Sequence, residues 1–469
     1  MKRVAPKDTK RRRAPHWLRR SGYVVFGVAI VVVAAIGLVL AINLPDRQLN
    51  AEANLWLAPL AEGTPSDTSY SLWALDAPAN VDAALVGRSV REAYAGRAAE
   101  ASTSGDWRIS RPYVEEPLVL PVELGCVDAS SACVSNALAH SHLVRDLAQK
   151  RAALLARVDL LDTEPRVDEA APPAEPNAPG AQYATLVAAQ SLSLALASVD
   201  VGDGHLDAGL PRLERMTRVA RKLSAGCKTL ACKATAVGML RRALLVYSEL
   251  MNQTPASAAL GASLARVNLP LGAAERDMSK LLAFEMQLAR HLDLALVHAR
   301  PARSDPFSQR VALAAAPLLF KPDATFNLQS SLADLESPLV HESAFEFARD
   351  SPNVLAAFHR REDEIGHIGL TGLYNPLGRT LASGLPDIEG IANQLHDVEG
   401  LQEALVAKVL LLHGAISHSD AQAFLDTKPG GAADVYSGNP FTWDDTASSI
   451  VVPQRGSRPV GKLRVGLAS

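Results

Sequence analysis

An uncharged run over residues 22–44, GYVVFGVAIVVVAAIGLVLAINL, constrains the fold of this chain more than any other feature. It follows a basic segment, residues 1–21, which holds nine Lys and Arg side chains and one acid. A helix rises about 1.5 Å per residue, so about 20 residues cross the ~30 Å hydrocarbon layer of a bilayer. The run ends at Pro45 and Asp46, where a helix is expected to stop. We therefore expect residues 22–44 to form a transmembrane helix.

Two other interpretations of the run were weighed. A buried helix of a soluble domain seldom follows a basic block, and this run lacks the polar face that a surface helix shows. A cleaved signal peptide has an apolar region of only about 7–15 residues. The nearest A-x-A pattern, residues 51–53, also lies well past the run. The sequence thus favours a signal anchor that stays attached.

Charge sets the expected orientation and partners. The positive-inside rule keeps residues 1–21 in the cytoplasm, and no second uncharged apolar run approaches 18 residues. The chain is thus predicted to cross the bacterial inner membrane once, with its bulk in the periplasm and residues 22–44 in contact with lipid. Residues 46–469 keep 38 of the 47 Lys and Arg and 49 of the 50 Asp and Glu. A part this acidic argues against a nucleic-acid partner, because phosphate binding needs clustered Lys and Arg.

Composition and spacing predict a mostly α fold after the anchor. Aromatic residues make up only 5% of the chain, Ala and Leu are frequent, and apolar residues recur every three or four positions. Residues 45–130 read as short helices and extended, Pro-punctuated segments, and 131–300 as an array of antiparallel helical hairpins. Five prolines and five acids in 162–182 predict a solvated linker or a long loop within that array. Helices are expected over 132–161, 183–200, 205–225, 229–252, 256–267 and 271–300.

The last region, residues 301–469, is expected to be mostly helical with a short extended tail. Ser can cap a helix and Pro suits its first position, so Ser351 and Pro352 predict a helix start. A β-branched run near residue 450 predicts a small hairpin. The other helices are expected at 339–350, 397–414 and 418–426.

The tail NPFTWDD, residues 439–445, predicts a structural role. Phe441 and Trp443 are two residues apart, so both face one side of an extended segment. We expect both rings to pack on a preceding helix, with Asp444 and Asp445 at the solvent edge. A sugar-binding or acid–base cluster is the alternative, but adjacent residues of a strand point to opposite faces.

The four cysteines form two similar pairs, Cys126 with Cys133 and Cys227 with Cys232. Thiols outside the cytoplasm oxidise. Two residues five apart within one helix have Cα atoms about 8.7 Å apart, which exceeds the ~7 Å limit for a disulfide. The first cysteine of the second pair must therefore precede the helix that holds the other. The sequence predicts two local disulfides, Cys126–Cys133 and Cys227–Cys232, each linking a loop to a helix start.

Neighbouring residues agree with this prediction. Gly226 can end the preceding helix and Thr229 can cap the next one. A four-cysteine zinc site prefers C-x2-C spacing, and a reactive redox pair prefers C-x-x-C; neither spacing occurs here. No catalytic, cofactor-binding or metal-ligating residue is predicted.

Three polar stretches were weighed as sites. Residues 200–207, DVGDGHLD, imitate a calcium loop, but two ligand positions are Gly and the twelfth position is Pro, so a helix–turn–helix connection is expected. In residues 359–367, His359 and His367 would lie about 12 Å apart along a helix, too far to share one ion. A solvated charged helix is expected there. A basic row is expected to be a solvated face, or to dock an acidic partner or a membrane surface; it comprises Arg212, Arg215, Arg218, Arg221 and Lys222.

The stretches YNPLGRTL, HDVEGLQEAL and YSGNPFTWDD, within residues 374–445, together with the anchor and the cysteine pairs, resemble those of a loose group of uncharacterised bacterial single-pass envelope proteins. The resemblance implies an envelope location and no activity. No nucleotide-binding, nucleophile-elbow or H-E-x-x-H motif occurs. The leading expectation is a membrane-anchored helical scaffold or interaction protein with an envelope protein partner. The alternative is an envelope hydrolase acting on cell wall or peptide through carboxylates of the late helices.

Overall fold

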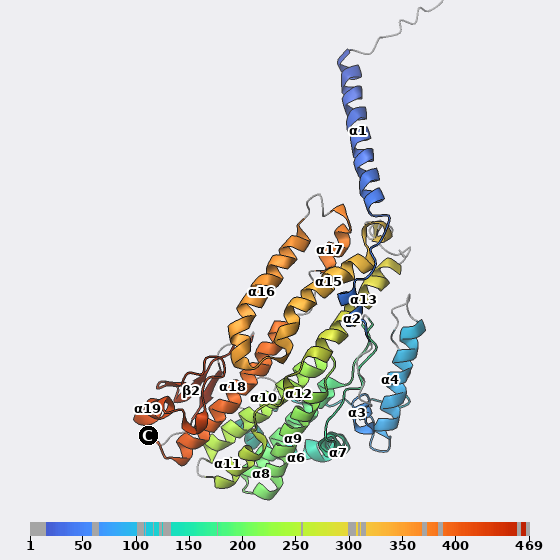
Figure 1. Ribbon diagram of the computed structural model, residues 1–469. Coiled ribbons are helices and arrows are strands. Elements are labelled where there is room, and N and C mark those ends of the chain that lie inside the picture. The colour runs from blue at the N-terminus through green and yellow to red at the C-terminus, as the bar shows by residue number, and fades with distance from the viewer. Residues whose placement is uncertain are drawn as a thin grey trace, which may run out of the picture.

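The computed structural model (Figure 1) is 70% helix and 2% strand, which confirms the prediction of a mostly α fold. Residues 1–15 of the basic segment, and Cys126, lie outside the described residues. The structure describes residues 16–58, 65–100, 107, 109–115, 117–121, 124, 133–175, 177–254, 257–298, 306–307, 310, 316–367, 373–382, 388–456 and 461–465.

Helix α1 (His16–Ile42) stands clear of the helical body (Figure 1). Its apolar side chains are exposed, with Phe26 at 66% and Val33 at 68%. Among the described residues, α8 (Tyr183–Gly202) alone is long and apolar enough to count as a membrane span by hydropathy. Because 67% of its apolar window is buried, α8 is a core helix of the body. The stretch Phe26–Ile42 forms a shorter apolar helix.

Short helices and extended chain follow α1. Trp73, just after α3, is 1% exposed and packs 5.8 Å from the Tyr94 ring of α4. Its indole N–H donates to the carbonyl oxygen of Ala170 at 2.9 Å, which fixes this region on the Pro-rich segment. The helices here are α2 (Ala51–Trp56), α3 (Asp67–Ser71) and α4 (Ala83–Glu100).

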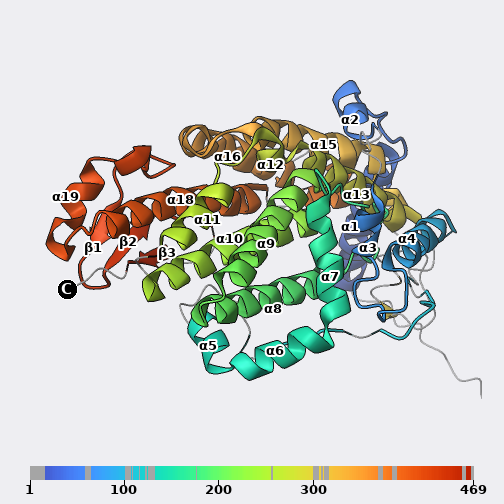
Figure 2. The same cartoon turned by 90° about the horizontal axis from the view of Figure 1, so that it is seen from below.

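The helix predicted over 132–161 is three helices that all contact α8, of which the second runs alongside it and the third crosses it (Figure 2). The backbone leaves helical geometry at His140 (φ −114°, ψ 32°) and at Arg151 (φ −109°, ψ 22°). Because of these breaks, each short helix can direct its own apolar residues toward α8. The apolar residues of a single straight helix could not all reach α8. The pieces are α5 (Cys133–Ala139), α6 (Ser141–Lys150) and α7 (Ala152–Leu160), followed by the 3-10 turn η2 (Leu161–Thr163).

The Pro-rich segment, residues 162–182, is mostly a long loop, which was one of the two predicted alternatives, but it is not the solvated linker that was the other. Val167 is fully buried and Glu169 is 1% exposed. The Val167 and Glu169 N–H groups donate to the carbonyls of Lys222 and Gly226, at 3.4 and 3.0 Å. Proline prevents a helix here, while the apolar and hydrogen-bonding residues between the prolines hold the segment on the core.

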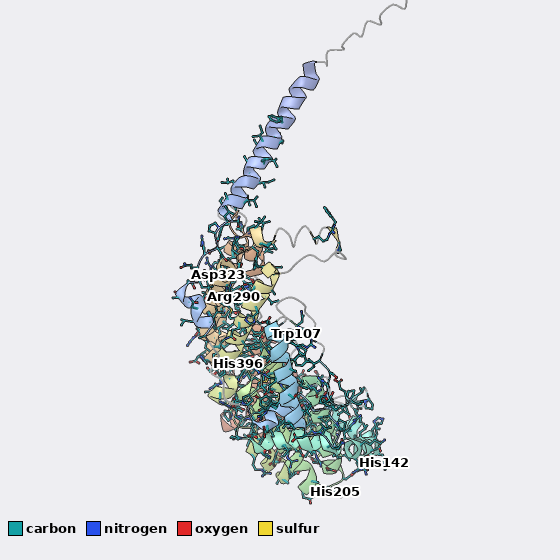
Figure 3. The ribbon with its side chains drawn as sticks, turned by 90° about the vertical axis from the view of Figure 1, so that its right-hand side faces the viewer. Trp107, His142, His205, Arg290, Asp323 and His396 are labelled. Atoms are coloured by element: carbon teal, nitrogen blue, oxygen red, sulfur yellow. A yellow bond between two sulfur atoms is a disulfide. The ribbon has the colours of Figure 1, made fainter. Side chains whose placement is uncertain are left out.

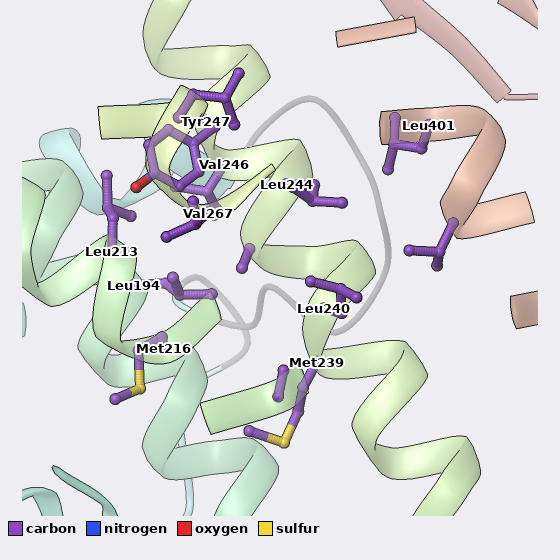
Figure 4. Close-up of a cluster of buried hydrophobic side chains, with 14 of the residues drawn as sticks. Leu194, Leu213, Met216, Met239, Leu240, Leu244, Val246, Tyr247, Val267 and Leu401 are labelled. Carbon is purple, nitrogen blue, oxygen red and sulfur yellow. The ribbon is translucent and has the colours of Figure 1, made fainter. Parts of the chain in front are cut away.

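The core is built around α8, α9 (Leu206–Gly226) and α10 (Leu230–Gln253), which pack side by side (Figure 2) and lie close to the predicted ranges. Buried side chains from these helices interleave in Figure 4, where Tyr247 lies near Val267 of α11 (Ala258–Val267). The segment expected as one helix over 271–300 is two, α12 (Ala273–Arg276) and α13 (Ser279–His298).

A second group of helices packs on this core and differs from prediction in its boundaries. The helix expected at 339–350 is a 3-10 turn followed by the start of a longer helix, and the helix expected at 397–414 begins at Ile388. Ser351 and Pro352 lie inside α16 (Ala344–Gly366), which instead begins at the capping box of Ser343 and Glu346. The remaining helices are α15 (Pro322–Glu336), η3 (Ser337–His341), α17 (Pro376–Ala382), α18 (Ile388–His413), η5 (His418–Asp420), α19 (Ala421–Asp426) and η6 (Pro429–Gly431).

Two buried asparagines join α1 to the body. The Asn375 backbone N–H donates to Asn43 Oδ1 at 2.7 Å, and Asn43 Nδ2 donates to the Leu373 carbonyl at 2.6 Å. Asn375 has φ 53°, which asparagine tolerates better than most residues. Gly378 is needed nearby, because a Cβ there would lie 1.9 Å from Thr325 Oγ1. The motif YNPLGRTL is thus a structural junction.

The chain after α1 continues along α15 as a hydrogen-bonded strap, residues 46–56. Asp46 caps α15 by accepting the N–H groups of Asp323 and Ala324, at 3.1 and 3.2 Å. Further along, Trp56 Nε1 donates to Asp334 Oδ1 at 3.0 Å. In Figure 3, Asp323 and its ion-pair partner Arg290 lie at the end of the body from which α1 emerges, and His142 and His205 lie at the opposite end.

The tail forms a three-stranded antiparallel sheet rather than the predicted hairpin: β1 (Thr442–Asp444), β2 (Ser449–Val452) and β3 (Gly461–Arg464), in that order. Phe441 and Trp443 are buried, as expected, and Asp445 is exposed. The Trp443 N–H donates to Gln422 of α19 at 2.7 Å, so the tail is held on a preceding helix. Asp444 is not inert at the solvent edge, because its Oδ1 accepts three hydrogen bonds in the turn that follows β1.

Trp443→Ala is expected to lower the free energy of unfolding by about 3 kcal/mol, near the low end for a buried aromatic ring. The low end applies because the buried indole Nε1 has no hydrogen-bond partner among the described residues, so the substitution also removes one unsatisfied donor. Urea unfolding followed by circular dichroism measures the change. Asp444→Ala is expected to cost about 1 kcal/mol and Asp445→Ala almost nothing. An unchanged midpoint for Trp443→Ala would contradict the structural role.

Candidate functional site

The disulfide Cys227–Cys232 forms as predicted between the end of α9 and the first turn of α10. Its Cα atoms are 5.5 Å apart because Cys227 is extended and lies just outside α9. Thr229 caps α10 by accepting the Cys232 N–H at 3.2 Å. Gly226 does more than end α9, since a Cβ there would lie 1.9 Å from the Val167 carbonyl oxygen.

The structure describes only one cysteine of the first pair, Cys133. Cys133 is the first residue of α5, at the helix start that the sequence predicted for it. Because Cys126 lies outside the described residues, the disulfide Cys126–Cys133 stays a prediction.

Glu169 holds the disulfide loop to the Pro-rich segment. Its Oε2 accepts the N–H groups of Lys228 and Thr229, at 2.6 and 2.9 Å. Its Oε1 accepts the Thr229 hydroxyl at 2.7 Å and the Tyr183 hydroxyl at 2.5 Å. Burial and the adjacent carboxylate raise the pKa of Tyr183 well above its usual value, so this hydroxyl remains a donor. The buried carboxylate is thus fully satisfied by four donors.

This cluster is no vacant metal site. Within the described ranges, Glu169, Cys227 and Cys232 form the one group of three potential ligands whose donor atoms all lie within 4.8 Å. The two sulfur atoms are bonded to each other, and metals bind the thiolate form. Both carboxylate oxygens already accept hydrogen bonds. The arrangement serves the structure of the loop.

The basic row of α9 is neither a solvated face nor a free docking surface, because every member pairs with an acid of this chain. Hydrogen bonds from Arg218 and Lys222 outweigh burial and lower the pKa of Asp162. The row therefore fastens α9 to α7, η2, α8 and α12. The pairs are Arg212–Asp200, Arg215–Asp159 at 2.7 Å, Arg218–Asp162 at 2.7 Å, Arg221–Glu275 at 2.7 Å and Lys222–Asp162 at 2.9 Å.

The two other stretches weighed as sites are structural. In the turn between α8 and α9, Asp203 pairs with Arg145, and Gly204 has φ 82°, as a tight helix–turn–helix connection requires. On α16, His359 is exposed and pairs with Glu362 one turn later at 3.1 Å. The first stretch is the helix–turn–helix connection that the sequence predicted, and the second lies on an exposed charged face of a helix.

A cleft of about 350 Å³ is the strongest candidate for a functional site. It opens between the start of α16, one face of α18, α12 and the loop around η6. Its walls are partly apolar, and Phe345 at the rim is 52% exposed. The lining residues are Pro270, Leu271, Arg276, Ser343, Ala344, Phe345, Glu399, Gln402, Glu403, Gly431, Ala433, Asp434, Val435 and Gly438.

Two carboxylates of α18 in the cleft differ in their surroundings. Glu399 accepts from His396 Nδ1 at 2.8 Å and lies 3.8 Å from Arg276, so its charge is partly balanced. Glu403 follows one helical turn later, and among the described residues nothing donates a hydrogen bond to its carboxylate. Burial, together with the charge of Glu399, raises the pKa of Glu403. Glu403 is therefore the carboxylate left for a ligand.

One buried acceptor in the cleft also lacks a partner. Gln402 is 4% exposed, and its Nε2 donates to the Leu269 carbonyl at 2.8 Å. This bond fixes the amide, but its Oε1 is buried and accepts nothing within the described chain. Most buried polar atoms in proteins are hydrogen-bonded, so this oxygen is an unmet acceptor beneath the cleft wall.

Two lysines are buried elsewhere in the core. Lys408 of α18 is fully buried and donates to the Ser248 carbonyl, the Ser248 hydroxyl and Asn252 Oδ1, at 2.7–2.8 Å. Burial lowers the pKa of Lys408 to about 7, although Glu249 opposes this. Lys233 is 1% exposed and donates to backbone carbonyls, and burial lowers its pKa to about 8. These lysines join helices and do not line the cleft.

The sequence did not predict the cleft, because its residues come from four separate segments. HDVEGLQEAL contains Glu399, Gln402 and Glu403, and their spacing places them on one helix face. That spacing was the available signal, but acids on a helix face are usually solvated. Comparisons of the chain with protein-family models, with curated proteins and with solved structures gave no match.

Proposed function

We propose that this chain is a membrane-anchored scaffold or interaction protein of the bacterial cell envelope. In this proposal α1 spans the inner membrane with its N-terminus in the cytoplasm, and an array of antiparallel helical hairpins presents a partner surface in the periplasm. The observation that carries the proposal is α1 itself. The side chains of Phe26 and Val33 are 66% and 68% exposed in the described chain, and the hydrocarbon layer of a bilayer would cover them.

The disulfide supports the same location. Cys227–Cys232 links the ends of two core helices, and structural disulfides persist outside the reducing cytoplasm. The basic residues before α1 favour the orientation that leaves this disulfide in the periplasm.

Topology reporters provide the test. A reporter that is active only outside the cytoplasm, fused after Ser469, is expected to be active, and a reporter that fluoresces only in the cytoplasm is expected to be dark there. The fusion is also expected to stay in the membrane pellet after alkaline carbonate washing, because a spanning helix resists that treatment.

The controls distinguish the alternatives. The mass of the intact protein shows whether the N-terminus is retained, and loss of residues 1–44 would support a cleaved signal peptide. An inactive outer reporter on a stable fusion would reject the orientation. Release of the full-length chain by carbonate would reject the membrane span.

An envelope hydrolase is the second candidate, because Glu399 and Glu403 both line the cleft. Their different surroundings resemble the division between a charged carboxylate and a raised-pKa acid in some hydrolases. If this function is correct, the protein releases fragments from purified cell wall or from a peptide, and Glu403→Gln abolishes that release without unfolding the protein.

A further inference from the structure

We infer that the cleft between α12, α16 and α18 binds an organic cation with an apolar stem, specifically the lysine or arginine side chain of a peptide segment. This inference rests on the proposed role as an interaction protein and names the chemistry of its partner.

The charge of the cleft is the first reason to expect a cationic ligand. Glu399, Glu403 and Asp434 line it together with a single cation, Arg276. Asp434 is engaged by its own loop, since it accepts from the Tyr436 N–H at 3.2 Å and from a neighbouring serine. Arg276 lies on the Glu399 side, so an incoming cation meets least repulsion at Glu403.

The unpaired Gln402 oxygen is the second reason, because it favours a ligand that donates hydrogen bonds. A buried acceptor without a donor costs about 1–3 kcal/mol, and the Gln402 amide cannot turn away without losing its bond to Leu269. The oxygen has almost no accessible surface, so a ligand removes this penalty only if it displaces the cleft wall beside Gln402 and donates an N–H group to the exposed oxygen. An ammonium or guanidinium group donates several N–H groups at once and can therefore satisfy Gln402 and Glu403 together.

The spacing of the carboxylates argues against a bare metal ion. No three acidic or histidine groups of the cleft appear among the described clusters whose ligand atoms all lie within 4.8 Å. A cation that reaches dispersed acceptors must extend over several atoms. A guanidinium fork has that extent.

The walls of the cleft suit a ligand that has an apolar stem and belongs to a peptide. Pro270, Leu271 and Val435 give the cleft apolar surface, and lysine and arginine bury their methylene stems against such surface. The start of α16, at Ala344 and Phe345, also lines the cleft. Its first backbone N–H groups lack partners within the helix, so they suit a carbonyl oxygen of the same peptide.

Calorimetry on the full-length protein in nanodiscs of uncharged lipid tests the inference. The probe is a capped Leu-Arg-Leu peptide, and its matched control carries citrulline, which keeps the shape of arginine without the charge. The arginine peptide is expected to bind at least ten-fold more tightly. Glu403→Gln and Gln402→Met are each expected to weaken its binding about ten-fold, whereas Glu364→Gln, an exposed glutamate of α16 outside the cleft, is expected to leave binding unchanged.

Each other outcome overturns the inference. Equal binding of both peptides would reject recognition of the cation, and no heat with 1 mM arginine peptide (roughly the weakest affinity of interest) would reject the site. Binding that survives both cleft substitutions would place the peptide elsewhere. Cleavage of the peptide, read by mass spectrometry, would favour the hydrolase. Thermal unfolding checks that each variant is folded, and the topology reporters fail or succeed independently of this result.

Discussion

Glu169→Ala is expected to lower the free energy of unfolding by more than about 4 kcal/mol. The substitution leaves four donors without their acceptor, including the backbone N–H groups of Lys228 and Thr229. Each orphaned donor costs about 1–3 kcal/mol, and water entering the new cavity recovers part of that loss. The Thr229 hydroxyl also caps α10, so its release weakens a helix start beside the disulfide.

Urea unfolding of the full-length protein in detergent, followed by circular dichroism, measures this loss. Glu164→Ala is the matched control, because Glu164 lies in the same segment and its carboxylate accepts a hydrogen bond from the Thr68 hydroxyl at 2.6 Å. It is expected to cost about 1 kcal/mol. Glu169→Gln keeps an acceptor and should fall between the two. Equal effects of Glu169→Ala and Glu164→Ala would show that the Glu169 network contributes little.

Lys408 is expected to make the protein more stable as the pH rises from 7 to 9.5. The native pKa of Lys408 is about 7, against about 10.4 in an unfolded chain. Between these values the unfolded state binds one proton more than the native state, so the free energy of unfolding increases with pH. At about 1.36 kcal/mol per pKa unit, the contribution of Lys408 over this range is about 3 kcal/mol.

Lys408→Met removes this contribution and keeps most of the side-chain volume. Its urea midpoint is expected to vary less between pH 7 and 9.5 than that of the wild-type protein. The variation that remains is assigned to Lys233, whose pKa is about 8. Lys150→Met is the control, because Lys150 is exposed and pairs with Asp146 on the surface of α6. A wild-type pH slope that persists in Lys408→Met would show that the buried amine is not its source.

Local signals in the sequence predicted the helices best where one helix packs along its whole length. The bounds of α8, α9 and α10 lie within a few residues of prediction, because their breakers are short and the apolar spacing is continuous. The second disulfide was predictable for a similar reason. Helix geometry alone required Cys227 to precede α10, and the structure agrees.

Tertiary contacts determine several features of the fold that local sequence signals could not predict. The Pro-rich segment looked solvated because its composition is polar, yet Glu169 is buried by residues about 60 positions later. The basic row of α9 looked exposed because its acidic partners, such as Asp159 and Glu275, lie more than 50 residues away in either direction. Pro352 stays inside α16 because the capping box at Ser343 had already set the helix start.

The junction between Asn43 and Asn375 has a mechanical consequence. The contacts of Asn43, Asp46 and Trp56 join one short strap to α15 and to the start of α17. Tension along α1 therefore reaches several bonds at once and does not peel them away singly. A body held in this way cannot swivel freely about α1, so the cleft keeps a constant direction relative to that helix. A load on the body would reach α1 through the same strap.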